Sequence, residues 1–272
     1  MRKLTLANVA AGALAVAGLA IASQVAPMAR AQSVPDLDGQ ALTVGSDTAY
    51  PPFEFVNEAG EIVGFDVDLL DAICEQANCE ATFQTAGFDT IFVALASGEY
   101  DVVASAVTIT EERARVVDFT RPYLNAGQVV TVAADSDIAD AEGLKDQLIG
   151  VQLGTTGDLE ASKITSDGNV KRYQTIDLAM AALAQGDVDG VIADAPTSAD
   201  IIGKEFEGKL EIVGEPFTTE FYGLAIQQAT PEITEAFDAA IAALIEDGTL
   251  AEIAEEWGLP PSAVSNLPES GL

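Results

Sequence analysis

The sequence contains no histidine and little positive charge. Its 272 residues include 44 aspartates and glutamates but only 12 lysines and arginines, which gives a formal net charge of −32. Without histidine, the chain cannot form a Ser-His-Asp, Cys-His or HExxH zinc site. The acidic excess argues against binding to nucleic acid or anionic lipid, because both require a basic surface. Hydrophobic residues make up 49% of the chain, so a buried core is expected.

Nucleotide and metal motifs are also missing. Gly203, Gly208 and Lys209 imitate the spacing of a phosphate-binding loop, but Leu210 follows where a Ser or Thr is required for Mg²⁺. The acid pairs Asp66/Asp68 and Asp187/Asp189 lack the twelve-residue loop of a calcium-binding hand, and are interpreted as solvated surface acids. No cofactor and no metal are therefore expected.

The N-terminus has the pattern of a secretory signal peptide. A positively charged start precedes an apolar run over residues 9–22, and Ala29 and Ala31 are small residues at the two positions that signal peptidase reads. The run is shorter than the ~20 residues needed to span a bilayer, although an N-terminal membrane anchor remains the alternative. We predict cleavage before Gln32 and a periplasmic location for the acidic remainder.

Only two cysteines are present, Cys74 and Cys79, at the predicted end of a helix and the predicted start of a strand. In an exported, oxidising setting we expect a disulfide between them, with two buried free thiols as the alternative. Because the closed loop is short, the entropic contribution of this bond is modest.

Strand-like and helix-like segments alternate along the chain. The predicted strands cover residues 41–45, 101–104, 149–152, 170–173 and 190–193. The predicted helices begin near Phe65, Phe88, Gly157, Ile176 and Pro231, and a last helix is expected to begin with a capping box formed by Thr249 and Glu252. Such alternation predicts an α/β fold with mostly parallel sheets, in which ligands bind beyond the carboxyl ends of the strands.

Polar groups follow several of these strands, in residues 45–53, 104–113 and 150–157. Arg113 carries a planar fork of donors that suits a carboxylate. A helix that begins in the third segment offers free backbone N–H groups to an anion. Asp194 follows a strand and could hold a cation.

These segments closely resemble the family 3 solute-binding proteins of polar amino-acid ABC importers, the periplasmic binders of glutamine, histidine and lysine/arginine/ornithine. Residues 64–77 look like the signature segment of that family. Further stretches match its patterns in order, at residues 47–53, 88–123, 150–156, 189–196, 222–223 and 247–249. The cysteine pair also resembles one in the histidine-type binders, with a shorter spacing.

The resemblance implies an α/β, two-lobe periplasmic-binding-protein fold of type II, a hinged flytrap with two strand crossings. On this sequence, lobe 1 is expected at about 36–130 plus 218–272, and lobe 2 at about 134–214. The hinges are expected near 127–133 and 215–221.

The resemblance also implies a ligand site. Arg113 would bind the α-carboxylate with help from the N–H groups of Thr108 and Thr156. Asp194 would bind the α-ammonium together with the Ala106 carbonyl and the Thr108 hydroxyl. The full expected set is Asp47, Tyr50, Phe88, Ser105, Ala106, Thr108, Arg113, Gln152, Thr155, Thr156 and Asp194, with Tyr50 and Phe88 enclosing the ligand side chain and Asp47 and Gln152 contacting its tip.

Each assignment has an alternative from the sequence itself. Arg113 could pair with Glu111 or Glu112 on the surface. Asp194, Thr155 and Thr156 could serve only as helix caps, and Phe88 only as a core residue of its helix.

The matched positions supply one cation, Arg113, and Asp47 would repel a distal carboxylate. A neutral or basic amino acid is therefore expected rather than an acidic one, although Ala193, where relatives often carry Gln or His, keeps compatible solutes open. We expect a monomeric binding protein that delivers its ligand to the permease of an ABC importer and catalyses no reaction. The alternatives are an enzyme on the same scaffold, of the cyclohexadienyl or arogenate dehydratase type, and a ligand-sensing module for a receptor.

Overall fold

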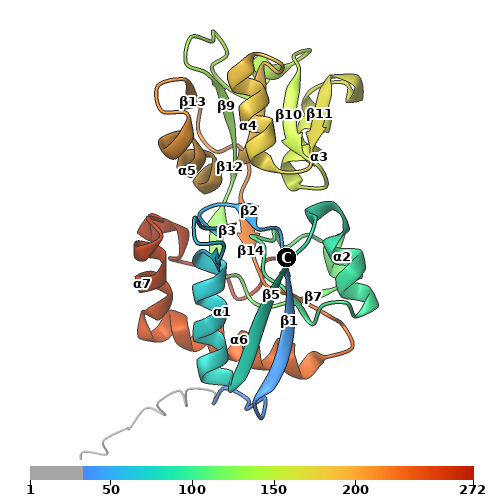
Figure 1. Cartoon of the computed structure of the whole chain (residues 1–272), viewed down its shortest axis with the longest axis vertical. Coiled ribbons are helices and arrows are strands. Elements are labelled where there is room, and N and C mark those ends of the chain that lie inside the picture. Colours follow the sequence, from blue (N-terminus) through green and yellow to red (C-terminus); the bar gives the residue numbers. More distant parts are fainter. Residues whose placement is uncertain (1–32) are drawn as a thin grey trace, which may run out of the picture. The chain divides into compact units, whose positions relative to one another are not determined.

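The computed structural model describes residues 33–272, so the expected signal peptide at 1–31 and its cleavage site lie outside the described residues. Two five-stranded sheets, each covered by helices, organise the described chain (Figure 1). The α/β class expected from the alternating pattern is confirmed. No helix of residues 33–272 is both long and apolar enough to cross a membrane.

The first sheet contains strands from both ends of the described chain. Its order is β5 (Cys79–Thr85), β1 (Gln40–Ser46), β6 (Val102–Val103), β15 (Ala225–Ile226) and β7 (Asp118–Phe119). β1 is parallel to β5 and β6, whereas β15 is antiparallel to its neighbours. The helices of this lobe are α1 (Phe65–Ala77), α2 (Phe88–Ser97), α6 (Pro231–Asp247) and α7 (Thr249–Glu256).

Helix α1 shows why the sequence pattern predicted this lobe. Phe65, Leu69 and Ile73 recur at one face of the helix and are fully buried, as the period of 3.6 residues requires. The helix ends where Asn78 adopts the left-handed conformation, with φ 55°. Cys74 near this end forms a disulfide with Cys79 at the start of β5, with a Cα–Cα distance of 4.6 Å. The expected disulfide is confirmed.

The second sheet has the order β11 (Val170–Tyr173), β10 (Ile149–Gln152), β12 (Gly190–Asp194), β9 (Gln128–Ala133) and β13 (Leu210–Val213). β10 is parallel to β11 and β12, and β9 is antiparallel to β12 and β13. Its helices are α3 (Thr156–Ile164), α4 (Ile176–Gln185) and α5 (Ala195–Glu205). The carboxyl ends of β10 and β12 carry Gln152 and Asp194.

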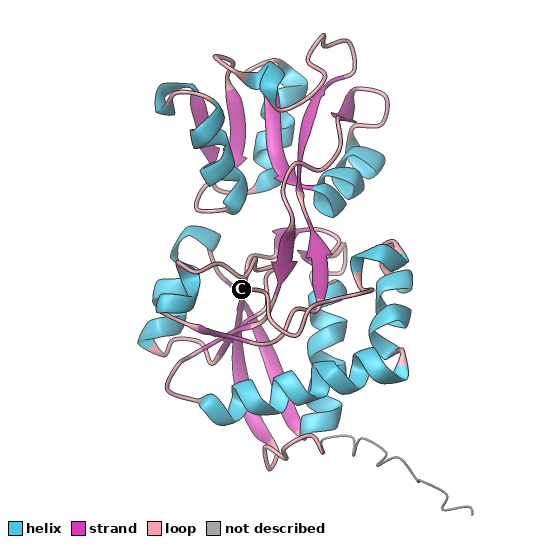
Figure 2. Cartoon of the chain, turned by 180° about the vertical axis from the view of Figure 1, so that it is seen from behind, coloured by secondary structure: helices cyan, strands magenta, loops and turns pink. Residues whose placement is uncertain are grey.

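The chain passes between the two sheets twice, after β8 (Leu124–Ala126) and before β14 (Glu220–Tyr222) (Figure 2). These two strands pair antiparallel, with Glu220 opposite Ala126. The two crossings approach each other closely at Gly127, where an added Cβ would lie 2.4 Å from the Thr218 carbonyl oxygen. The lobe and hinge boundaries expected from the resemblance stay predictions.

Three short strands form a small sheet beside the first lobe, β2 (Ala49–Tyr50), β3 (Glu54–Val56) and β4 (Ile62–Val63). One local prediction is wrong. Gly248, not Thr249, is the residue that caps α7, and the Thr249 backbone N–H donates to Asp247 at 2.9 Å. Gly248 reaches φ 91°, a conformation that favours glycine, so the helix begins at Thr249, one residue earlier than a capping box with Thr249 as its N-cap requires.

Candidate functional site

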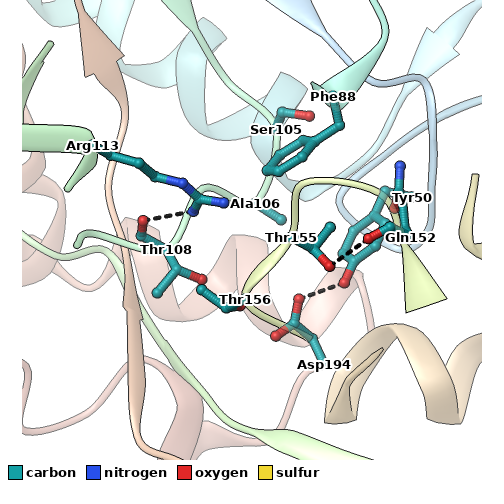
Figure 3. A pocket seen from close by; sticks show the side chains of 10 residues that line it. All are labelled: Tyr50, Phe88, Ser105, Ala106, Thr108, Arg113, Gln152, Thr155, Thr156 and Asp194. Atoms are coloured by element: carbon teal, nitrogen blue, oxygen red, sulfur yellow. Dashed lines mark hydrogen bonds between the residues drawn. The ribbon is translucent and has the colours of Figure 1, made fainter. Parts of the chain in front are cut away.

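Ten of the eleven expected site residues line one cavity between the two sheets (Figure 3). They come from β2, the start of α2, the segment after β6, the carboxyl ends of β10 and β12, and the start of α3. The lining residues are Tyr50, Phe88, Ser105, Ala106, Thr108, Arg113, Gln152, Thr155, Thr156 and Asp194. The eleventh, Asp47, is buried and reaches this set through Gln152.

Arg113 is the cation of this cavity. Its guanidinium donates to the Thr108 carbonyl at 2.8 Å and to the Gly154 carbonyl at 3.3 Å. It lies over the rings of Phe88 and Phe92, with 5.2 and 4.8 Å between the guanidinium carbon and the ring centroids, where cation–π attraction is effective. Burial lowers the pKa of Arg113 to about 10, so the group stays charged at neutral pH.

The surface ion pair considered for Arg113 is not formed. Among the ion pairs of residues 33–272, none joins Arg113 to Glu111 or Glu112. The guanidinium instead binds two carbonyl groups, those of Thr108 and Gly154, and lines the cavity. It has five N–H donors, so these two bonds leave others for a ligand.

Asp194 ends β12 and is buried at the opposite side of the cavity. Its backbone occupies the N-cap position of α5, but its side chain makes no capping bond. The carboxylate accepts instead from the Tyr50 hydroxyl and from Gln128 Nε2, the latter at 2.7 Å. The alternative that Asp194 serves only as a cap is therefore wrong. Burial, reinforced by the Glu220 charge, raises the pKa of Asp194 to about 7.

A group of acids surrounds the far end of the cavity. Gln152 Nε2 donates to the Asp47 carboxylate and, at 3.1 Å, to the Gln174 carbonyl. Burial, together with the charges of Asp177 and Asp89, raises the pKa of Asp47 to about 6 against the opposite effect of the Gln152 bond. This end of the site is consequently electronegative, whatever the ligand.

The two threonines that begin α3 have different roles. The Thr155 hydroxyl accepts from the Asp158 backbone N–H at 3.2 Å, so its capping role is confirmed. The Thr156 hydroxyl caps nothing and donates to Glu220 at 2.8 Å. Thr155 and Thr156 both line the cavity, so the helix begins beside it, and the free N–H groups of a first helical turn are suited to an anionic group.

Ser105 and Ala106, here called the floor segment, line the cavity. They are hydrogen-bonded to two buried acids that sequence reasoning missed. The Ala106 N–H donates to Asp66 at 2.8 Å, and the Ser105 hydroxyl donates to Glu54 at 3.0 Å. Ala106 has φ 45°, an unfavourable value for a residue with a side chain. The interpretation of Asp66 as a surface acid is wrong, because its side chain is fully buried beneath this floor.

Burial raises the pKa of both acids, that of Asp66 to about 7 and that of Glu54 well above its usual range. Oε2 of Glu54 receives no hydrogen bond from a donor of the described residues. With a proton retained, Glu54 can donate to Asp66, and Tyr123 donates to Asp66 at 2.9 Å. No periodicity distinguishes such an acid from an exposed one, so the sequence carries no signal for this pair.

In this cavity, the Arg113 guanidinium and the start of α3 lie opposite the buried Asp194 carboxylate. The end of the cavity near Asp47 is electronegative. Such an arrangement can pair both charges of a zwitterion, which must be neutralised when it leaves water. In this form the cavity measures about 10 Å³, room for about one water molecule. The Tyr50–Asp194 and Gln152–Asp47 bonds span it, so a larger ligand requires these contacts to separate.

Two sheet-based lobes with a polar site between them define the class of two-lobe solute-binding proteins. Residues 42–260 match the model of the bacterial extracellular solute-binding proteins, family 3, and the chain belongs to this family. The arginine-binding periplasmic protein of Mannheimia haemolytica is 33% identical over 216 residues, with 78% of this chain and 88% of that protein covered. The histidine-binding periplasmic protein of Escherichia coli K12 is 29% identical over 227 residues, with 80% and 87% covered.

A solved structure shows the same fold. The arginine-, lysine-, histidine-binding protein ArtJ of Geobacillus stearothermophilus is 36% identical to this chain. The match covers 80% of this chain and 95% of that protein, with a TM-score of 0.76. The type II fold expected from the sequence is therefore confirmed.

Proposed function

We propose that the protein binds an L-amino acid with a cationic side chain, arginine being the first candidate, and delivers it to the permease of an ABC importer. The observation that carries this proposal is the charge distribution of the cavity. Arg113 is its cation, and Asp47, Asp89 and Asp177 place negative charge around the far end. The relatives named for binding arginine, histidine and lysine support the same ligand class.

In this proposal the ligand lies between Arg113 and Asp194. Arg113 and the first N–H groups of α3 bind the α-carboxylate, and Asp194 with the Ala106 carbonyl binds the α-ammonium. Tyr50 and Phe88 enclose the side chain, whose tip reaches Gln152 and the acids beyond it. The ammonium replaces the Tyr50 hydroxyl as a partner of Asp194.

A thermal-shift screen over the common L-amino acids tests this assignment. A ligand at 100 times its dissociation constant stabilises the folded protein by about 2.7 kcal/mol, which is readily detected. Arginine, lysine and histidine are expected to raise the melting temperature, whereas aspartate and glutamate leave it unchanged. A response to the acidic pair alone, or to no amino acid, contradicts the proposal.

The location and the partner are part of the same proposal. We infer an exported monomer that begins at Gln32, because the N-terminus has a signal-peptide pattern and the family is extracellular. N-terminal sequencing of protein from the periplasmic fraction tests this inference. Recovery of a chain that retains residues 1–31 in the membrane fraction contradicts it.

An enzyme on this scaffold is a second candidate, and one observation favours it. Asp194 has a pKa raised to about 7 inside the cavity, a property of general acids. However, Tyr50 and Gln128 both donate to its carboxylate, which prepares it to pair with an ammonium group. Incubation with prephenate and arogenate distinguishes the two functions, since the binding protein leaves both substrates unchanged.

A further inference from the structure

Glu220 is a buried acid next to the ligand site that no sequence motif singled out. It begins β14, the strand that carries the chain back from the second sheet to the first. Its side chain is only 7% exposed. It shares a strand face with Tyr222, two residues on, and both side chains are buried.

Three hydroxyl groups donate to this single carboxylate. Oε2 accepts from Thr108 at 2.7 Å and from Thr156 at 2.8 Å, so one oxygen holds a threonine from each lobe. Oε1 accepts from Thr218 at 3.1 Å. Thr108 and Thr156 both line the ligand cavity.

The direction of these bonds decides what the threonines can offer to a ligand. A hydroxyl has one proton, and a carboxylate can only accept. Because Thr108 Oγ1 donates its proton to Glu220, this hydroxyl oxygen has only lone pairs left for a ligand. Oγ1 takes part in no other hydrogen bond among residues 33–272. Thr156 is fixed in the same direction, and its oxygen already accepts from Gln128 Nε2 at 3.1 Å.

We propose that Glu220 is a specificity-determining positioning residue, which orients the Thr108 hydroxyl as an acceptor and so selects ligands with an α-ammonium over those with an α-hydroxyl. The inference rests on the proposed function and explains how the amino end of the ligand is recognised. Together with Asp194, the Thr108 oxygen makes this end of the cavity a surface of acceptors. An ammonium group can donate to both, whereas a ligand hydroxyl has one proton and leaves an acceptor unpaired.

The test compares L-arginine with L-argininic acid, its α-hydroxy analogue, by calorimetric titration of the full-length exported protein. Wild-type protein is expected to prefer arginine. In Glu220→Gln, the amide can donate to Thr108 and reverse its hydroxyl. The preference for arginine is then expected to fall by about tenfold or more, the range of a hydrogen bond to a charged group.

A double-mutant cycle separates this role from a general effect of charge. Thr108→Val removes the hydroxyl, and alone it should lower the preference to a similar degree. In the Thr108→Val background, adding Glu220→Gln should lower the preference for arginine over argininic acid by less than about threefold more, because coupled residues do not act additively. Thr108→Val also provides the test if Glu220→Gln fails to fold. Glu211→Gln, at an exposed residue of β13 outside the expected hinges, is the control and should keep the wild-type preference.

Several results overturn the inference. The first is an equal loss of affinity for both ligands in Glu220→Gln, which would show a purely structural role. The second is an undiminished effect of Glu220→Gln in the Thr108→Val background. A wild-type protein that binds arginine without preference over argininic acid also overturns it, while the proposed function stands. A wild-type protein that binds no arginine overturns both.

Discussion

At the residue scale, the site consists of one cation, Arg113, and buried carboxyl groups at different distances from it. The pKa values of Asp47 and Asp194 are raised to about 6 and about 7, in both cases chiefly by burial. Their charged forms are therefore costly until a cation arrives. A ligand ammonium or a cationic side chain removes that cost, so the acids favour the ligand class by electrostatics and not by shape alone.

Replacing Arg113 should abolish most of the affinity. We expect Arg113→Ala to weaken amino-acid binding by about 2–5 kcal/mol, because it leaves a buried carboxylate without its partner. Arg115→Ala is the matched control, since Arg115 lies two residues away in the same short helix and is exposed. Calorimetry that finds equal affinities for the two variants would contradict the role of Arg113.

Ligand binding should depend on pH in a defined direction. Below about pH 7, Asp194 retains a proton in the free protein and must release it to pair with an ammonium group. The dissociation constant should therefore rise as the pH falls from about 8 to about 5, by up to about tenfold per pH unit for each proton released. Calorimetry in buffers of different ionisation enthalpy measures that release, and a pH-independent affinity would oppose the account.

The site residues also show how much of the site could be predicted from the sequence. The eleven site residues were predicted from the resemblance to the family 3 solute-binding proteins, and several of them follow strand ends, where the fold gathers polar groups. Glu54, Asp66 and Glu220 were not identified as buried acids near the site. Their burial depends on contacts with Ser105, Tyr123 and Thr108, which lie 51, 57 and 112 residues away along the chain, and no local pattern records such contacts.

At the element scale, the floor segment after β6 connects the binding site to the stability of the first lobe. Its backbone N–H at Ala106 and its hydroxyl at Ser105 are bonded to Asp66 and Glu54. Burial raises the pKa of both acids, so ionising the pair completely is costly. The segment is therefore expected to loosen as the pair loses its last proton.

A Glu54→Gln substitution tests this support. Both acids have raised pKa values in the folded protein, so their contribution to stability is present below their ordinary values near 4 and is lost as the pH rises through about 7. The glutamine amide can donate to Asp66 at any pH. We expect the free energy of unfolding to fall less for Glu54→Gln than for wild type between about pH 5 and about pH 8.

Urea unfolding followed by circular dichroism measures this difference. Glu58→Gln, at an exposed residue of the β3–β4 turn, is the control and should follow the wild-type pH dependence. A Glu54→Gln protein that loses as much stability as wild type over this range would show that the pair does not hold a proton.

Sequence patterns predicted some short strands to the residue and missed others. The strands at 149–152 and 170–173 were predicted with their observed bounds, and residues 149–152 form a buried strand followed by a glycine-containing turn. β2, β4 and β15 have two residues each, too few to show a period. The start of α7 was misplaced because the backbone of Gly248, and not a side chain, decides it.

At the scale of the whole molecule, the formal charge of −32 must be accommodated by the fold. Five ion pairs join residues of the described chain, and surface pairs contribute only about 0–1 kcal/mol each. Mutual repulsion among the remaining acids therefore dominates the long-range electrostatics.

Added salt should stabilise the protein for this reason. Screening weakens the repulsion among exposed acids more than it weakens the few ion pairs. We expect the free energy of unfolding, measured with urea, to rise from low to high sodium chloride. A decrease in stability with salt would indicate that the ion pairs outweigh the repulsion.

The central claim is that one cavity between the lobes binds an amino acid with a cationic side chain. Calorimetric titration with L-arginine and L-citrulline tests it most directly, because the two ligands have similar shape and differ in side-chain charge. We predict binding of arginine at one site, with citrulline weaker by about tenfold or more, the size of one charge-assisted hydrogen bond. Absence of arginine binding, or equal affinity for the two ligands, would contradict the account.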